Sequence, residues 1–167
     1  GEWEADGIKK QKLILDVEPG LSATAYLFWP ANATGRIPGI LACHGHGAFG
    51  KAPIMGVAPN DNPQLRASIE THNYAYGLTM AHAGFAVIAI DWRGFGERDD
   101  RRAPFNIKLE GRDLCNLHYL RATIMGMTVL GMNVHDGQCA LDHLCAQEFV
   151  DEDRIGVMGL SFGGTMT

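Results

Sequence analysis

The chemistry that the sequence suggests most directly centres on one serine. Residues 159–163 read Gly-Leu-Ser-Phe-Gly, which fits the pattern G-x-S-x-G. That pattern places the serine on a sharp turn between a strand and a helix, where its hydroxyl is exposed. An apolar, strand-like run precedes the turn, and a glycine pair with a helix-like start follows it. We therefore predict that Ser161 is a nucleophile and that Gly159 and Gly163 leave room for the close crossing of strand and helix.

A second glycine-rich stretch could supply the groups that stabilise negative charge. Residues 43–47 read Cys-His-Gly-His-Gly and follow an apolar, strand-like run. Acyl transfer to a serine needs two N–H donors that point at the developing oxyanion. One donor is expected from Phe162, the residue after the nucleophile, and the other from this loop. We predict the backbone N–H of His46 as the second donor, with Gly47 as the alternative, and expect Gly45 to let the loop turn inward.

The two histidines of this loop allow another interpretation, a metal site. Two histidines without an accompanying carboxylate or cysteine set make a weak metal site, so neither a metal nor another cofactor is predicted. His44 is instead predicted to be a packed, hydrogen-bonded residue that shapes the loop. The cysteines match no zinc or redox spacing and are expected to be reduced. They are Cys43, Cys115, Cys139 and Cys145.

Other ionisable residues are weaker candidates for catalysis. Asp91 and Arg93 follow a strand-like run and could be catalytic, but a structural pair that fixes the loop is the favoured interpretation. Three histidines lie in or near a long helical pattern and precede the serine, whereas the acid and the base of this architecture follow it in the chain. They are His118, His135 and His143.

The elements that must position these residues alternate along the chain. The expected strands lie within residues 12–18, 23–30, 37–47, 85–94 and 155–160. The expected helices cover residues 68–84, capped by Ser68, and most of residues 117–149, with a loop at 50–67 and a turn at 150–154. Alternating strands and helices with buried strands predict an α/β fold. We expect a mostly parallel sheet with an N-terminal antiparallel hairpin around Pro19-Gly20.

The composition limits the possible classes of function. The chain has 167 residues, of which 46% are hydrophobic, and a net charge of −5. This size suits one domain. The net negative charge gives no sign of a basic surface, so nucleic acid is not an expected partner. No apolar run reaches the length needed to span a bilayer, so no membrane partner is expected. A segment resembling a signal peptide is not seen, which slightly favours a cytoplasmic location.

Taken together, these residues resemble the α/β-hydrolase superfamily, in its acetyl-xylan-esterase-like and dienelactone-hydrolase-related branch. The resemblance extends from about Arg36 onward and is carried by HGHG, YGLTMAHAGFAVIAIDWRGFGER, LGMNVHDGQCALDHL and VDEDRIGVMGLSFGGTMT. It implies an α/β-hydrolase fold, Ser161 as the nucleophile, and the backbone N–H groups of His46 and Phe162 as the oxyanion hole. It also implies hydrolysis of a carboxylic ester through an acyl-serine. Dienelactone hydrolases proper use a cysteine, so the serine favours the esterase side, and acetylated sugars are suggested by the resemblance alone.

The resemblance also implies residues that follow the serine. Members of the superfamily continue with further strands that carry the triad acid and histidine. We therefore expect residues 1–167 to be the N-terminal part of a single α/β-hydrolase domain, ending just after the nucleophile turn and inactive alone. The expected partners are a small-molecule ester and either a C-terminal half or a second copy that covers the strand at 155–160. A peptidase or other hydrolase on the same turn, and a non-catalytic assembly or binding module, are the alternatives.

Overall fold

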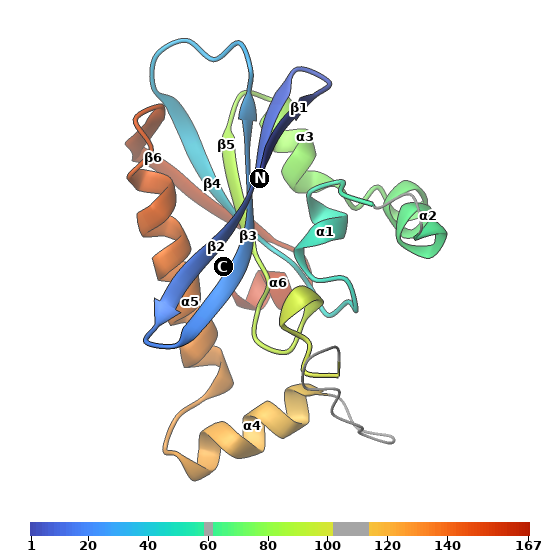
Figure 1. Cartoon of the computed structure of the whole chain (residues 1–167), viewed down its shortest axis with the longest axis vertical. Helices are drawn as coiled ribbons and strands as arrows, with labels where there is room; N and C mark the ends of the chain where they lie inside the picture. Colours follow the sequence, from blue (N-terminus) through green and yellow to red (C-terminus); the bar gives the residue numbers. More distant parts are fainter. Residues whose placement is uncertain (59–61, 102–113) are drawn as a thin grey trace.

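A single mixed sheet forms the centre of the molecule (Figure 1). The computed structural model describes residues 1–58, 62–101 and 114–167. Its six strands are ordered β1-β2-β3-β5-β4-β6 across the sheet. They are β1 (Glu2–Ala5), β2 (Ile8–Glu18), β3 (Leu21–Pro30), β4 (Ile37–Cys43), β5 (Ala86–Ile90) and β6 (Val150–Gly159).

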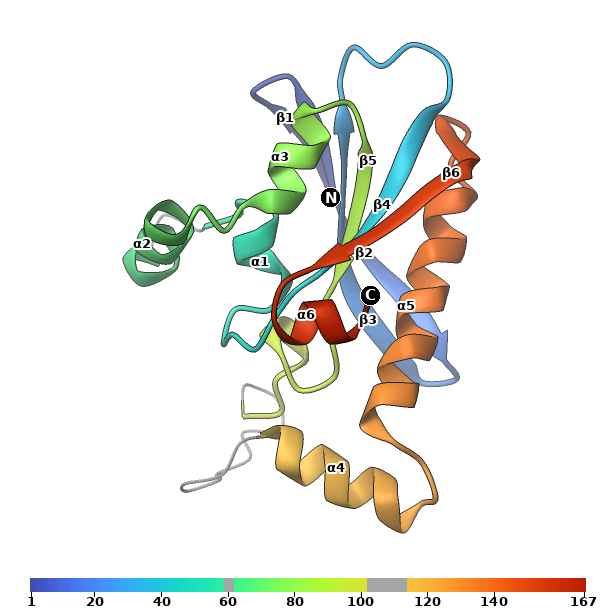
Figure 2. The ribbon, with the colours of Figure 1, turned by 180° about the vertical axis from the view of Figure 1, so that it is seen from behind.

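Helices cover both faces of this sheet. The helices are α1 (Lys51–Ile54), α2 (Pro63–His72), α3 (Tyr76–His82), α4 (Leu114–Ile124), α5 (Val129–Cys145), α6 (Phe162–Thr165) and the short 3₁₀ helix η1 (Gly96–Arg98). Helix α5 lies along one face, while α1 and α3 lie on the other, as the two opposite views show (Figures 1 and 2). Among the described residues, no helix is long and apolar enough to cross a membrane.

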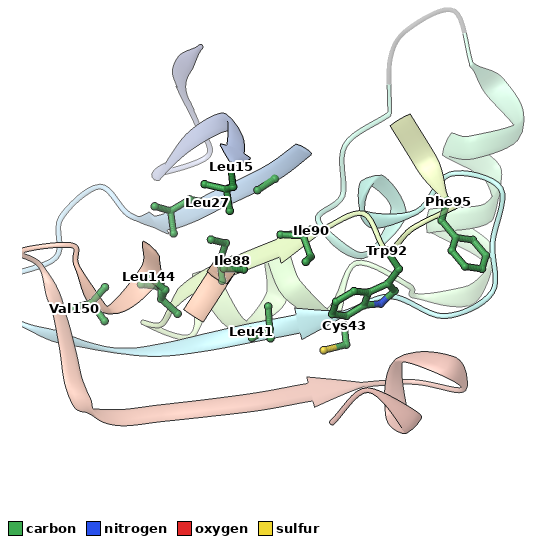
Figure 3. Packing of buried hydrophobic residues seen from close by; sticks show 13 residues of the cluster. Leu15, Leu27, Leu41, Cys43, Ile88, Ile90, Trp92, Phe95, Leu144 and Val150 are labelled. Atoms are coloured by element: carbon green, nitrogen blue, oxygen red, sulfur yellow. The ribbon is translucent and has the colours of Figure 1, made fainter. Parts of the chain in front are cut away.

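Each face of the sheet carries its own apolar cluster. On the α5 side, Leu144 packs with residues of β2 to β5, and the cluster extends to Trp92 and Phe95 beyond the end of β5 (Figure 3). On the α1 and α3 side, Ile54 and Ala81 pack with the opposite faces of the same strands. All five residues of β5 are buried, which explains why its sequence is continuously apolar rather than alternating.

The predicted α/β architecture is confirmed, and the sheet is mixed. The hairpin expected at Pro19-Gly20 is β2 and β3, which pair antiparallel from Ile8 opposite Pro30 to Glu18 opposite Leu21. The parallel part consists of β4 with its neighbours β5 and β6. Because β3 also pairs antiparallel with β5, parallel pairing is confined to these three strands.

The helix expected at residues 68–84 is two helices, and the predicted Ser68 cap is wrong. Helix α2 begins five residues earlier, where the side chain of Asn62 accepts a hydrogen bond from the Leu65 N–H at 3.0 Å. Asn followed by Pro is a strong start signal, since Pro suits the first helical turn. Asn73, at φ 46° and ψ 46°, ends α2 in the left-handed region. Part of the expected loop at 50–67 is therefore helical.

Two later expectations also differ in detail. The helical stretch at 117–149 is split into α4 and α5 by a break containing Gly126 at φ 72°, and Thr128 caps α5. The turn expected at 150–154 is part of β6. There Asp151 pairs with Pro38 and Ile155 pairs with the next residue, so the residues between them form a bulge. Residues 97–113 are rich in charge, and their sequence predicts an irregular segment; of these, residues 102–113 lie outside the described residues.

Candidate active site

Ser161 has a backbone conformation that is rare for a residue other than glycine. It lies between β6 and α6 with φ 59° and ψ −122°. Within residues 1–58, 62–101 and 114–167, two other residues besides glycine have positive φ, namely Asp6 and Asn73. Asn and Asp tolerate the left-handed region because their short polar side chains bond locally, whereas the ψ of Ser161 lies far from that region. A conformation of this kind costs of order 1–3 kcal/mol and persists only where the surroundings enforce it.

The glycines on either side of the serine allow a very close crossing of backbones. A Cβ atom on Gly159 would lie 2.4 Å from the carbonyl carbon and oxygen of Gly163. A Cβ atom on Gly163 would lie 2.1 Å from the carbonyl oxygen of Cys43, at the end of β4. The start of α6 is thus pressed against both β6 and β4. A side chain at either position would force the turn open.

The loop after β4 lies beside the serine. An added Cβ on Gly45 would be 3.5 Å from Cβ of Ser161 and 3.0 Å from the carbonyl oxygen of Leu160. The ring of His46 lies 4.6 Å, between centroids, from the ring of Phe162. The structure therefore brings together four of the predicted site residues, Gly45, His46, Ser161 and Phe162.

Both ring nitrogens of His44 form hydrogen bonds that shape this loop. Its ring is completely buried, Nε2 accepts a hydrogen bond from the Trp92 N–H at 3.1 Å, and Nδ1 lies 2.8 Å from the carbonyl oxygen of Gly45. Because Nε2 accepts, Nδ1 carries the proton and donates to Gly45. Burial lowers the pKa of His44, so the ring is neutral. Its second nitrogen is already used as an acceptor, which leaves His44 unsuited to take a proton from Ser161.

A cavity opens next to the serine turn. Its volume is about 460 Å³, and its lining includes His46, Phe49, Tyr74 and Leu160. Leu160 directly precedes the serine, and an added Cβ on Gly45 would lie 3.0 Å from the Tyr74 hydroxyl. From the sequence, the loop at 47–67 is expected to line the substrate pocket because it follows the strand that carries the predicted oxyanion loop. Gly47, Phe49, Gly50 and Pro53 line this cavity. Its size suits a small organic molecule.

A model of the Abhydrolase family matches residues 1–166. The chain belongs to the Abhydrolase family. YtaP of Bacillus subtilis (strain 168), a protein named as a hydrolase, is 30% identical to it over 159 residues. That match covers 93% of this chain and 46% of YtaP, so the chain spans about half the length of this curated relative.

Solved structures similar to this Abhydrolase-family chain have the same fold. A Bacteroides fragilis NCTC 9343 protein named as an acetyl xylan esterase matches with a TM-score of 0.83 and 20% identity, over 99% of this chain and 42% of that one. Acetyl Xylan Esterase 1 from Thermoanaerobacterium sp. JW/SL YS485 matches with a TM-score of 0.64 and 22% identity, over 98% and 44%. The dienelactone hydrolase-like promiscuous phosphotriesterase P91 from metagenomic libraries matches with a TM-score of 0.56 and 20% identity, over 96% and 52%. The predicted resemblance is confirmed.

The predicted pairing of Asp91 with Arg93 is wrong. Asp91 pairs with Lys51, at 2.7 Å between Oδ2 and Nζ, while Arg93 forms ion pairs with Asp136, at 2.7 Å, and with Glu18. Positions two apart in an extended strand share a face. Asp91 and Arg93 lie beyond the end of β5 at Ile90, and the chain turns at Arg93, so their side chains leave in different directions. Neither Lys51 nor Asp136 was singled out from the sequence. Lys51 lies in a stretch expected to be a loop, and Asp136 lies in a helical stretch that carried the resemblance without an assigned role for this residue.

The three histidines noted in or near the long helical pattern of this Abhydrolase-family chain contact other parts of the structure. Nε2 of His135 lies 2.9 Å from the carbonyl oxygen of Val17 in β2. His118 lies 3.7 Å from Asp100, and His143 contacts Gln147, which lies just past the end of α5. Within the ranges that the structure describes, no group of three or more His, Cys, Asp or Glu could hold a metal ion. Burial raises the pKa of the Cys43 thiol to about 12, so this thiol is a poor nucleophile.

Proposed function

We propose that the protein hydrolyses carboxylic esters through an acyl-serine on Ser161. The observation that carries this proposal is the conformation of Ser161, φ 59° and ψ −122°, held between two glycines that have no room for a side chain. A serine of an ordinary strand-to-helix turn would not need this strained geometry. Membership of the Abhydrolase family supports hydrolysis as the general reaction.

In the proposed reaction, Oγ of Ser161 attacks the ester carbonyl carbon and loses its proton to a general base. The carbonyl oxygen becomes an oxyanion, which the backbone N–H groups of His46 and Phe162 would stabilise. When the tetrahedral intermediate collapses, the C–O bond to the alcohol breaks and the alcohol leaves with a proton. Water then attacks the acyl-serine by the same route, which releases the acid and restores the serine.

We propose that the general base and the acid that orients it lie outside residues 1–167, in a further part of the same polypeptide or of a second copy of it. Two observations support this: His44 already uses both ring nitrogens, and YtaP is about twice as long as this chain. On this proposal residues 1–167 alone would be inactive or nearly so.

Small acyl esters, including acetyl esters of sugars, are the proposed substrates. Two structures of the same fold are named as acetyl xylan esterases, which makes acetylated sugars the first class to test. The cavity beside Ser161 offers hydroxyl groups from Ser68 and Tyr74 next to the aromatic ring of Phe49. These groups suit a small polar alcohol portion.

Labelling with a fluorophosphonate tests the proposal in the full-length protein. An activated serine attacks phosphorus, so rapid modification at Ser161, located by mass spectrometry and abolished in Ser161→Ala, is expected. Hydrolysis of p-nitrophenyl acetate and acetylated xylan should disappear in the same variant. If peptide anilides were cleaved faster than esters, the bond specificity would be wrong. If wild-type protein were neither labelled nor active, a non-catalytic binding module would replace the enzyme.

A further inference from the structure

The loop that carries His46 is held at both ends by two adjacent residues. At its start, His44 accepts a hydrogen bond from the Trp92 N–H at 3.1 Å. At its end, Lys51 donates from its backbone N–H to Oδ1 of Asp91 at 2.8 Å. Asp91 and Trp92 directly follow β5, whose backbone is fixed between β3 and β4. The rigid end of one strand therefore fixes both ends of the loop.

The carboxylate of Asp91 is enclosed in a site built around it. Its Oδ2 accepts hydrogen bonds from Nζ of Lys51 at 2.7 Å, from the Glu97 N–H at 2.9 Å and from the Thr24 hydroxyl at 3.0 Å. Gly50 and Gly96 both have positive φ, and a Cβ on either would lie 2.0 Å or 2.2 Å from Oδ1 of Asp91. Backbone atoms of Gly50 and Gly96, from two different loops, therefore lie directly against the buried carboxylate of Asp91.

Lys51 uses all three of its ammonium protons in this site. Nζ donates to Asp91, to Glu97 at 2.8 Å and to Thr24 at 2.9 Å. The lysine and Asp91 are both 1% exposed. Burial raises the pKa of Glu97, but hydrogen bonds from Lys12 and Lys51 outweigh it and hold the pKa below its ordinary value. Glu97 is therefore a carboxylate that completes the shell around Lys51.

A buried ion pair of this kind contributes little net stability, because removing two charges from water offsets much of their attraction. Apolar side chains of similar size would stabilise the fold as well or better. What the pair does provide is geometry, since charge-assisted hydrogen bonds are short and directional. The feature that this geometry controls is the path of residues 44–50, which include His46.

We propose that Lys51 and Asp91 are positioning residues that place the His46 N–H for stabilisation of the oxyanion. This proposal rests on the proposed function of Ser161 and His46. The two residues touch no reacting atom and act through the loop backbone. Their effect should therefore appear in the chemical step, because an oxyanion donor interacts more strongly with the transition state than with the bound substrate.

The test uses the full-length protein and its Lys51→Met variant. Fluorophosphonate titration first counts the reactive serines. The value of kcat is then expressed per reactive site, so that a fraction of unfolded protein does not lower it. We expect kcat for p-nitrophenyl acetate, per titrated site, to fall about 10- to 100-fold with KM changed less than about twofold. Affinity for an aryl trifluoromethyl ketone, which forms a tetrahedral adduct with serine, should fall by a similar factor.

Lys12→Met is the matched control. Lys12 donates to the other carboxylate oxygen of Glu97 at 2.6 Å, but its side chain is 44% exposed. This variant removes a lysine from the same carboxylate without touching Asp91, and kcat per site should match that of wild type. If Lys51→Met does not fold, Thr24→Val replaces it. That nearly isosteric change removes the hydroxyl shared by Lys51 and Asp91, and it should lower kcat per site several-fold.

Three results would overturn the proposal. A Lys51→Met variant with a lower melting temperature but wild-type kcat per titrated site would show a purely structural role. Equal losses in Lys12→Met and Lys51→Met would assign the effect to Glu97. Wild-type protein that shows no reaction with the fluorophosphonate would overturn the proposed function itself, and the positioning role with it.

Discussion

Replacing Gly163 with alanine tests the most tightly packed contact of the serine turn. The added Cβ would lie 2.1 Å from the carbonyl oxygen of Cys43 and 2.8 Å from its carbonyl carbon. A carbon–oxygen contact normally needs about 3.3 Å. The start of α6 and the end of β4 must therefore separate by about 1.2 Å. Both atoms it meets belong to backbone, which cannot rotate away as a flexible side chain could.

That separation acts directly on the proposed oxyanion hole. Ser161 and Phe162 move with α6, whereas His46 follows β4, so the two N–H donors and the nucleophile lose their alignment. A misplacement of about 1 Å costs on the order of 100-fold in rate. Overpacking a tight site costs about 1–3 kcal/mol of stability. We expect Gly163→Ala to lower kcat for p-nitrophenyl acetate about 100-fold and to lower the melting temperature as well.

Gly164→Ala provides the control at the next position. The nearest atom to its added Cβ is the carbonyl oxygen of Gly159 at 3.7 Å, an ordinary contact. This variant should keep wild-type kcat and stability, because alanine suits a helix better than glycine does. Rates are measured on the full-length protein, with unfolding followed by circular dichroism. If Gly163→Ala kept wild-type kcat, the close crossing of α6 and β4 would not position the catalytic groups.

Four further outcomes are expected. His46→Ala should lower kcat/KM only slightly because the backbone N–H remains. His46→Pro removes that N–H and should cost about 3 kcal/mol of transition-state stabilisation, measured as kcat/KM. Equal losses in the two variants would mean that the imidazole itself acts. Burial lowers the pKa of His44 in the folded protein. As the pH falls below about 6.5, His44 is therefore protonated in the unfolded chain before it is protonated in the folded protein, and the free energy of unfolding should decrease. That slope of melting temperature against pH should flatten in His44→Asn, and an unchanged slope would assign the loss to other groups. A polypeptide of residues 1–167 should hydrolyse p-nitrophenyl acetate weakly at most, since loss of triad function costs on the order of a million-fold, and robust turnover would require a base within these residues. If another segment or a second copy covers the outer edge of β6, amides at 155–160 should exchange slowly in the full-length protein and faster in the 1–167 polypeptide.

The parts of the fold that the sequence predicts are those set by local pattern. The hairpin follows from two β-rich runs around Pro19-Gly20, and β5 follows from five consecutive apolar residues. Helix boundaries were less predictable because several residues can cap a helix. Ser68 and Asn62 both fit a start signal, and the proline after Asn62 favours the earlier one. The bulge within β6 was not predictable, since its charged residues read as a turn until β4 supplies a partner.

The residues of the candidate site were also predictable only where a local motif defines them. Ser161 and its glycines could be found from the sequence because a sharp turn restricts residue type at fixed spacing. The partner of Asp91 could not be found in this way. Lys51 lies 40 residues away, in a helix of four residues, and nothing in its neighbourhood indicates a buried lysine. The sequence placed a charge at the end of β5, but only the folded chain shows which opposite charge approaches it.

The two charges at the end of β5 therefore connect different parts of the structure. A pairing between Asp91 and Arg93 would fix one loop on itself. Pairing Asp91 with Lys51 instead joins that loop to the one after β4, and pairing Arg93 with Asp136 joins it to α5. Since β4 and β5 are neighbours in the sheet, the loops that follow them leave the same edge, where active sites of open α/β sheets are built. Ion pairs that join such loops fix the backbone near the serine turn. On the function and the positioning role proposed above, these charges would act on catalysis through position rather than by proton transfer.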